Sequence, residues 1–326
     1  MKVITVFVFL FVGTMLILGI GGTSPGFENW TRGEAPFVGG FASIMAIFMV
    51  AGFSFQGTEL IGVAAGESED PEKNIPKAIH SIFWRILLFY IGVFVVIGFL
   101  IPYDDPNLLN SSVENVAISP FTLVLDRFGF AFAASFINAI ILTAVLSAGN
   151  SGLYASTRML YAMAKEGDAP KVFTKLNSRG VPVPALLATA AFGVFAFLTS
   201  LIGEGTAYNW LINISGMSGF IAWLGIAIAH YRFRRAFHAQ GKSLDAIPFK
   251  ALFYPFGPIF ATVLCLIIIA GQNYTAFTGE TIDWYGASVA YIGIPVFLLV
   301  YAAYKSKYKT HVIPLKEVNL DRDYEK

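Results

Sequence analysis

The residues best suited to chemistry lie in one short stretch, "GFSFQGTELIG", from Gly52 to Gly62. It directly follows the apolar run "GGFASIMAIFMVA", yet it carries a carboxylate at Glu59 together with glutamine, serine and threonine side chains. At the centre of a bilayer a carboxylate costs about 2.5–3.5 kcal/mol on insertion scales, so it persists only beside a cavity or a partner. If this segment spans a membrane, Glu59 is the first candidate for a functional group.

The composition places the chain in a membrane. Hydrophobic residues make up 56% of the 326 residues and charged residues only 13%, whereas soluble domains carry about 25% charged residues. A chain with so few charged residues cannot expose its whole surface to water. We therefore expect lipid to cover part of that surface. The net charge is only +1, and without a basic arm or stripe we expect no nucleic-acid partner.

Eight apolar segments are long enough to cross a bilayer, which takes about 20 residues in a helix. Because the alternation of a membrane β-barrel is absent, we expect an all-α integral membrane protein. Segments rich in proline and glycine, such as "EDPEKNIP" and "YPFGP", mark the breaks between the spans. The expected spans cover residues 3–21, 38–66, 80–102, 130–156, 183–203, 208–230, 252–272 and 284–304.

The positive-inside rule gives the orientation of these spans. With the N-terminus in the cytoplasm and eight crossings, all but Arg32 and Arg127 of the 22 Lys and Arg residues fall on the cytoplasmic side. We therefore expect both ends of the chain in the cytoplasm.

The stretch around Glu59 has the features of a discontinuous helix within residues 38–66. Gly52 and Gly57 flank "FSFQ", and glycine lets the backbone leave helical geometry cheaply. Secondary transporters use such breaks to build a substrate site near the midplane, where half-helix amides suit a carboxylate and carbonyls suit a cation. We expect the second half-helix to start near Gly57–Thr58. The alternative is a continuous, kinked helix with a snorkelling Glu59.

The motif "GFSFQGTELIGVAAGESEDPEKNIPKAI" resembles the sixth helix and following loop of bacterial amino-acid permeases of the amino acid–polyamine–organocation superfamily. The resemblance continues through "NAIILTAVLSAGNSGLYASTRMLYAMA" and "SGMSGFIAWLGIAIAHYRFRRAF" and covers essentially the whole chain. It implies a twelve-helix fold built as a five-plus-five inverted repeat with two further helices, and lysine as the expected substrate.

By this resemblance the chain begins inside the fifth helix, so the four preceding helices are expected in the intact protein. Residues 1–21 are then the last helix of repeat one and residues 38–230 form repeat two. Residues 252–304 hold the two additional helices, and residues 305–326 form a cytoplasmic tail.

The resemblance also implies the site residues. Phe53 takes the place of the aromatic residue that closes over the substrate, and "NISGMSGFIAW" offers a second flexible wall, although its small residues could equally serve helix packing. The expected substrate-binding residues are Gly52, Phe53, Ser54, Phe55, Gly57, Thr58, Glu59, Ser215 and Gly216.

The expected proton-coupling residues are Lys2, Glu59 and Ser147. In proton-coupled relatives a lysine at the position of Lys2 replaces a sodium ion, and it would bridge the fifth helix to the eighth. There Thr143, Ser147 and Asn150 share one helical face. The competing interpretation of Lys2 is a topology anchor that the positive-inside rule explains fully.

We therefore expect a permease of the bacterial cytoplasmic membrane that imports lysine with protons by alternating access. Permeases for arginine, aromatic or neutral amino acids are the alternatives. A membrane-embedded enzyme would need a set of nucleophile, base and metal ligands that the spans lack, and a channel would need repeated polar rings. The four histidines and the single Cys265 lack ligand spacing, so we expect no metal and no cofactor.

Overall fold

The structure of the protein is a computed structural model of the whole chain. The residues that it describes are helices, turns and connecting segments, and no β-strand occurs among them. They comprise residues 2–21, 24–40, 43–44, 47, 51–52, 54–65, 68–109, 119–127, 129–130, 132–198, 204–247, 250–278 and 280–320.

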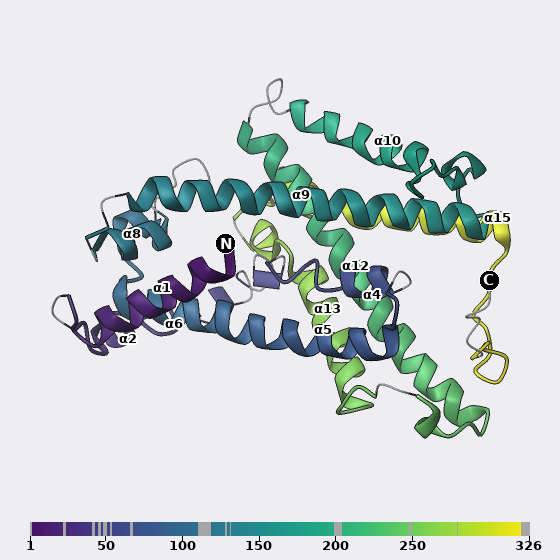
Figure 1. Cartoon of the computed structure of the whole chain (residues 1–326), viewed down its shortest axis with the longest axis horizontal. Coiled ribbons are helices and arrows are strands. Elements are labelled where there is room, and N and C mark those ends of the chain that lie inside the picture. Colours follow the sequence, from purple (N-terminus) through teal and green to yellow (C-terminus); the bar gives the residue numbers. More distant parts are fainter. Residues whose placement is uncertain are drawn as a thin grey trace. The chain divides into compact units, whose positions relative to one another are not determined.

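Figure 1 shows the helices in chain order. The α-helices are α1 (Lys2–Ile17), α2 (Glu28–Thr31), α4 (Leu60–Ala65), α5 (Pro71–Ile86), α6 (Gly92–Leu100), α7 (Pro106–Leu109), α8 (Pro120–Arg127), α9 (Ala133–Glu166), α10 (Val183–Phe192), α12 (Glu204–Ala239), α13 (Phe256–Gly271), α14 (Trp284–Tyr291) and α15 (Gly293–Tyr308). A π-helical turn, η1 (Leu87–Ile91), joins α5 to α6. Short 3₁₀ turns cover Lys171–Thr174, Gly193–Leu198, Leu244–Ala246 and Tyr274–Phe277.

Within the described residues, three helical stretches are long and apolar enough to cross a membrane: Pro71–Leu100, Ala133–Glu166 and Trp210–Ala239. The helices α14 and α15 would form a fourth span, bent by 45° at their junction. Shorter apolar helices occupy Val3–Ile17, Val183–Phe192 and Phe256–Gly271, within three of the remaining expected spans. The expected span over 38–66 lies partly outside the described residues. The count of eight therefore stays a prediction.

Two expected boundaries are wrong. The segment "EDPEKNIP" was expected to be a break, but α5 begins at Pro71 and contains Pro76; proline suits the first helical position because its missing N–H would have no helical partner there. The expected span 130–156 continues as α9 to Glu166 and ends at Gly167, whose φ of 91° is left-handed. Glycine adopts this conformation without the steric penalty of a Cβ.

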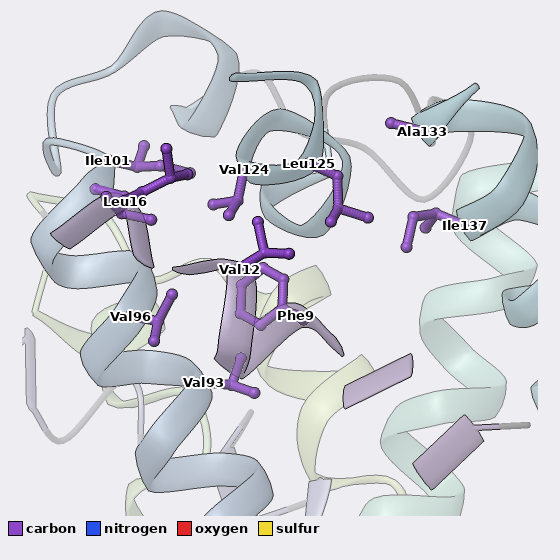
Figure 2. Close-up of a cluster of buried hydrophobic side chains, with 11 residues drawn as sticks. Phe9, Val12, Leu16, Val93, Val96, Ile101, Val124, Leu125, Ala133 and Ile137 are labelled. Carbon is purple, nitrogen blue, oxygen red and sulfur yellow. The ribbon is translucent and has the colours of Figure 1, made fainter. Parts of the chain in front are cut away.

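The chain divides into two compact units. Unit 1 comprises Met1–Gly40, Val63–Ser68 and Lys73–Ala191. Its hydrophobic core is formed by α1, α6, α8 and the first turns of α9 (Figure 2). Phe9 of α1 and Val124 of α8 are completely buried. Gly13 lets α1 approach α6 closely, because a Cβ there would overlap Val96.

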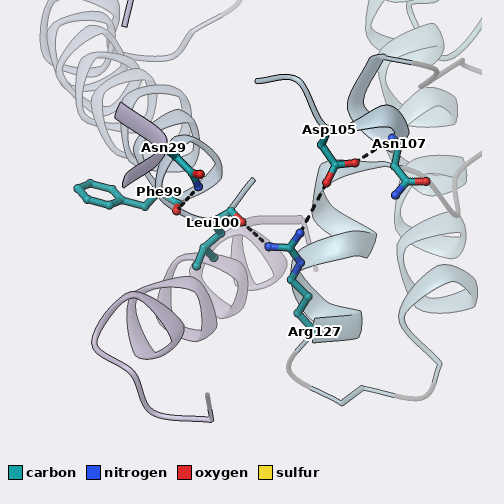
Figure 3. A network of polar contacts seen from close by, with 6 residues as sticks. All are labelled: Asn29, Phe99, Leu100, Asp105, Asn107 and Arg127. Atoms are coloured by element: carbon teal, nitrogen blue, oxygen red, sulfur yellow. Dashed lines mark hydrogen bonds and ion pairs between the residues drawn. The ribbon is translucent and has the colours of Figure 1, made fainter. Parts of the chain in front are cut away.

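A polar network covers the C-terminal end of α6 in unit 1 (Figure 3). Helix ends leave carbonyl groups without helical partners. Here the Asn29 side chain donates to the Phe99 carbonyl at 2.7 Å, and the Arg127 guanidinium donates to the Leu100 carbonyl. Arg127 also lies 3.7 Å from the Asp105 carboxylate. Side chains thus supply hydrogen-bond donors to the carbonyl groups at the C-terminal end of α6.

Unit 2 comprises Phe41–Gly62, Glu69–Glu72 and Phe192–Lys326. Its centre is α12, which packs against α13, α14 and α15. Met217 of α12 is fully buried, and Gly293 at the start of α15 leaves room for its side chain. The tail after α15 returns to the end of α12, where Gln240 donates to the Val318 carbonyl at 2.8 Å.

Candidate functional site

The segment around Glu59 leaves helical geometry, as the sequence predicts. Residues 51, 52 and 54 are helical, residues 55–59 form a turn, and α4 begins at Leu60. The turn contains Gly57 with a φ of 97°, which is a conformation that strongly favours glycine. The second helical piece thus begins two to three residues later than the expected Gly57–Thr58.

The Glu59 carboxylate folds back onto this turn. The Gly57 amide donates to both of its oxygens, at 3.1 and 3.0 Å. Such a local side-chain acceptor competes with helical hydrogen bonding, which explains why α4 starts only after Glu59. The sequence had suggested that amides here would be free for a substrate carboxylate. For Gly57 this expectation is wrong, because the protein's own carboxylate takes the amide.

A second donor to Glu59 comes from α12. The indole Nε1 of Trp223 lies 2.9 Å from Glu59 Oε2. Both donors are neutral, and no Lys, Arg or His nitrogen among the described residues lies within ion-pair distance of Glu59. The carboxylate is therefore held by hydrogen bonds while its negative charge remains uncompensated by any residue that the structure describes.

The turn is tied to α12 at a second point. The Gln56 side chain donates to the Gly216 carbonyl at 2.7 Å. Between the two attachment points, a Cβ at Gly219 would overlap the Gln56 amide, and a Cβ at Gly52 would lie 2.5 Å from Phe220. The small residues of "SGMSGF" therefore serve close approach of the turn to α12.

A cavity of about 600 Å³ lies beside this contact within unit 2. The broken segment contributes Gly52 and Phe55, α12 contributes Phe220 and Trp223, and α13 closes another side with residues that include Cys265. The lining is mainly apolar. Ligand pockets of about 300–1,000 Å³ with apolar walls and a few placed polar groups are typical of small-molecule sites.

Several expected site residues meet here. The structure brings Gly52, Phe55, Gly57, Glu59 and Gly216 together at the contact between the turn and α12. Ser54 and Ser215 are exposed, and Thr58 is half-buried in the turn, so the binding role of these three residues stays a prediction. Phe53 lies outside the described residues.

The expected coupling residues outside the turn lie in unit 1. Lys2 begins α1, but its side chain lies outside the described part of the structure. Ser147 is exposed on α9, and its carbonyl accepts from the Ser151 hydroxyl at 2.9 Å. The coupling role of both residues therefore stays a prediction.

Two contacts of this site, those of Gln56 and Trp223, were not predicted from the sequence. A signal for Trp223 was present, because Gly216, Gly219 and Trp223 stand at positions i, i+3 and i+7 and so share a helical face. The two glycines indicate a helix face against which the broken segment can pack closely. Trp223 lies on the same face, so its indole N–H is a candidate donor to a polar group of that segment.

Comparison with known proteins gives a consistent result. Residues 1–316 match the amino acid permease family. The chain is 55% identical to the lysine-specific permease LysP of Escherichia coli over 327 residues, covering all of this chain and 67% of that protein. It is 49% identical to LysP and 48% identical to the histidine permease HisP of Lactococcus lactis, covering 98% and 99% of this chain and 64% and 67% of those proteins.

The chain thus spans about two thirds of the length of these relatives. The match extends over nearly all of its residues, and it includes both the broken segment and α12. The chain belongs to the amino acid permease family, whose members are multi-span membrane transporters and not enzymes.

Proposed function

We propose that the protein imports a cationic amino acid, lysine, across the membrane by alternating access. The observation that carries this proposal is the Glu59 carboxylate, which neutral donors hold in place. One of these donors, Trp223, lines a cavity of about 600 Å³. Lysine carries one net positive charge, which complements this carboxylate, and its aliphatic chain suits apolar walls. Two bacterial relatives that are named lysine-specific permeases support lysine as the substrate.

Transport is proposed to be driven by protons. Glu59, Lys2 and Ser147 are the proposed coupling residues, with Lys2 losing and regaining a proton in each cycle. Lys2→Met should weaken lysine accumulation and flatten its dependence on pH, while lysine binding suffers less. Lys2→Arg should not restore coupling, because a guanidinium stays charged at every working pH. An unchanged pH profile in Lys2→Met would reduce Lys2 to a topology anchor.

The proposed location is the bacterial cytoplasmic membrane, with both ends of this chain in the cytoplasm. The distribution of Lys and Arg residues supports this orientation. In the proposed organisation, residues 1–21 complete repeat one, residues 38–230 form repeat two and residues 252–304 add two helices. Four further helices would precede residue 1, and they would supply the other half of the substrate site.

The experiment that tests the proposal is uptake of labelled lysine into liposomes with and without an imposed proton gradient. It should use the extended chain, meaning residues 1–326 preceded by those four helices from the lysine permease of E. coli. We expect saturable uptake that the gradient accelerates. The 326 residues alone should insert without concentrating lysine, and gradient-independent, non-saturable flux through the extended chain would contradict a coupled transporter.

Histidine is a second candidate substrate, because a relative named histidine permease is 48% identical to the chain. Competition separates the two candidates. If lysine is the substrate, unlabelled lysine should suppress uptake of labelled lysine at concentrations at which histidine, arginine, aromatic and neutral amino acids do not. Stronger competition by histidine would reassign the substrate while leaving the transporter class unchanged.

A further inference from the structure

Trp223 is placed to control the orientation of the Glu59 carboxylate. Its indole N–H donates to Oε2 of Glu59 at 2.9 Å. The indole ring is itself fixed by packing, since it meets the Phe220 ring edge to face with centroids 5.9 Å apart. Phe220 is almost completely buried. A rigid aromatic neighbour therefore holds the donor in one place.

The hydrogen bonds to Glu59 leave part of its acceptor capacity free. An ionised carboxylate offers about four lone-pair sites. The Trp223 indole donates to one carboxylate oxygen, whereas the Gly57 amide donates to both oxygens. These donors turn the group into one orientation without filling all of its acceptor sites. An Arg or Lys at position 223 would orient the carboxylate equally well but would neutralise it, so a neutral donor is the suitable choice.

The same side chain also borders the cavity. Trp223 lines its wall together with Phe55 of the broken segment. One indole thus presents its N–H to the carboxylate and part of its ring to the adjoining apolar space. Aromatic side chains with a polar edge are suited to such a boundary.

We propose that Trp223 is a positioning residue for substrate binding, whose indole N–H holds the Glu59 carboxylate in the orientation that receives the cationic group of the substrate. This inference rests on the proposed function. The hydrogen bond from Trp223 affects the affinity for substrate. Without the indole donor the carboxylate samples other rotamers, and fewer of its orientations can bind a cation. The rate of the transport cycle at saturating substrate should depend much less on this hydrogen bond.

The variant that tests it is Trp223→Phe in the extended chain, because phenylalanine keeps an aromatic ring and lacks the donor. We expect the KM for lysine uptake to rise about tenfold, close to the lower limit for a single hydrogen bond to a charged group, while the maximal rate changes less than about twofold. Trp210→Phe is the matched control. Trp210 lies on the same helix, lines a different cavity, and should leave both parameters unchanged.

A binding measurement separates positioning from damage to the fold. Lysine affinity should be measured by equilibrium binding in the wild type, Trp223→Phe, Glu59→Gln and the double variant. If the indole acts through Glu59, Trp223→Phe should weaken binding about tenfold in the wild type and by less than about twofold in Glu59→Gln, since energetically coupled residues are non-additive. A residue needed only for folding would weaken binding equally in both backgrounds.

Lysine should also change the fluorescence of the wild type and of Trp210→Phe, and this change should be absent from Trp223→Phe.

The outcomes of these experiments are distinct. An unchanged KM in Trp223→Phe, or equal losses in both Glu59 backgrounds, overturns the role of Trp223 and leaves the proposed function standing. Failure of the wild type to bind and transport lysine overturns the proposed function and this inference with it.

Discussion

Two of the places where the chain leaves helical geometry, one after α6 and one before α4, differ in how their charged groups are paired. At the end of α6 in unit 1, Arg127 and Arg32 meet Asp105 and Asp104, with nitrogen–oxygen distances of 3.7 and 3.2 Å. At the turn over residues 55–59 in unit 2, the charged group is Glu59, and its donors among the described residues are the neutral N–H groups of Gly57 and Trp223. At each site, side chains form hydrogen bonds with backbone groups that have no partner within the helix.

The difference is the one expected between a structural site and the proposed substrate site. Where each charged side chain has a partner of opposite charge, the charges compensate one another, and the network attracts a charged ligand only weakly. Where a carboxylate is held by neutral donors, the negative charge stays available to a cation, and a less polar environment strengthens that attraction. Arg32 and Arg127 are also the two basic residues expected outside the cytoplasm, and each has an acidic partner in the structure.

The largest expected effect follows from removing the charge of Glu59. Glu59→Gln keeps the size of the side chain and an oxygen that can accept from Trp223, but it removes the negative charge. In the extended chain, the ratio Vmax/KM for lysine uptake should fall about 100-fold, because a charged contact contributes roughly 1.5–3 kcal/mol. Membrane insertion should be normal or improved, since burying a neutral amide costs less than burying a carboxylate.

Glu59→Asp sharpens this prediction, because aspartate keeps the charge but shortens the side chain. It should lose less uptake than Glu59→Gln if the charge matters more than reach. Near-normal uptake in Glu59→Gln at equal protein levels would reduce Glu59 to a tolerated polar residue.

A smaller effect is expected from disturbing the contact between the turn and α12. Gly219→Ala should lower lysine uptake about fivefold to tenfold, because the new Cβ would overlap the Gln56 amide and break its bond to the Gly216 carbonyl, worth roughly 1 kcal/mol. Gly225→Ala is the matched control on the same helix, where a Cβ would meet nothing within 4 Å. Both changes raise helix propensity equally, so equal uptake in the two variants would show that the contact is dispensable.

The network at the end of α6 should affect stability and leave transport affinity alone. Arg127→Ala removes the donor to the Leu100 carbonyl and the partner of Asp105. We expect a loss of about 1–2 kcal/mol, seen as a Tm several degrees lower in detergent, with the KM for lysine unchanged. Arg179→Ala, at an exposed residue of the same unit, is the control. A changed KM in Arg127→Ala would contradict the assignment of this network to structure alone.

The smallest effect is expected at Asp245 and Lys250, an exposed pair 2.6 Å apart. The hydrogen bond and charge of Lys250 hold the pKa of the Asp245 carboxyl below its ordinary value. A lowered carboxyl pKa stabilises the folded state above the unfolded pKa of about 3.9, and this contribution is lost as the pH falls through the folded value. Lys250→Met should therefore raise the pKa of Asp245, measured by NMR titration, and leave uptake at neutral pH unchanged. A drop in uptake would assign this loop a role in transport.

Much of the architecture could be predicted from the sequence. Long apolar runs predicted the helices, and glycines around a carboxylate predicted the break near Gly57. The extension of α5 back to Pro71 could not be predicted from apolar periodicity, since its first turns are polar. The capture of the Gly57 amide by Glu59 was also missed, because it depends on a side-chain rotamer. The contact with Trp223 joins residues 164 positions apart, and only the packing of the turn on α12 reveals it.

The central claim is that Glu59 offers an uncompensated negative charge to the cationic side chain of the substrate. The most direct test compares the affinities of lysine and norleucine, which lacks the side-chain ammonium, in the wild-type extended chain and in Glu59→Gln. The account predicts that the wild type prefers lysine by at least about 100-fold and that Glu59→Gln reduces this preference to below about tenfold, a change of about 1.4 kcal/mol or more. The same preference in both proteins would contradict it.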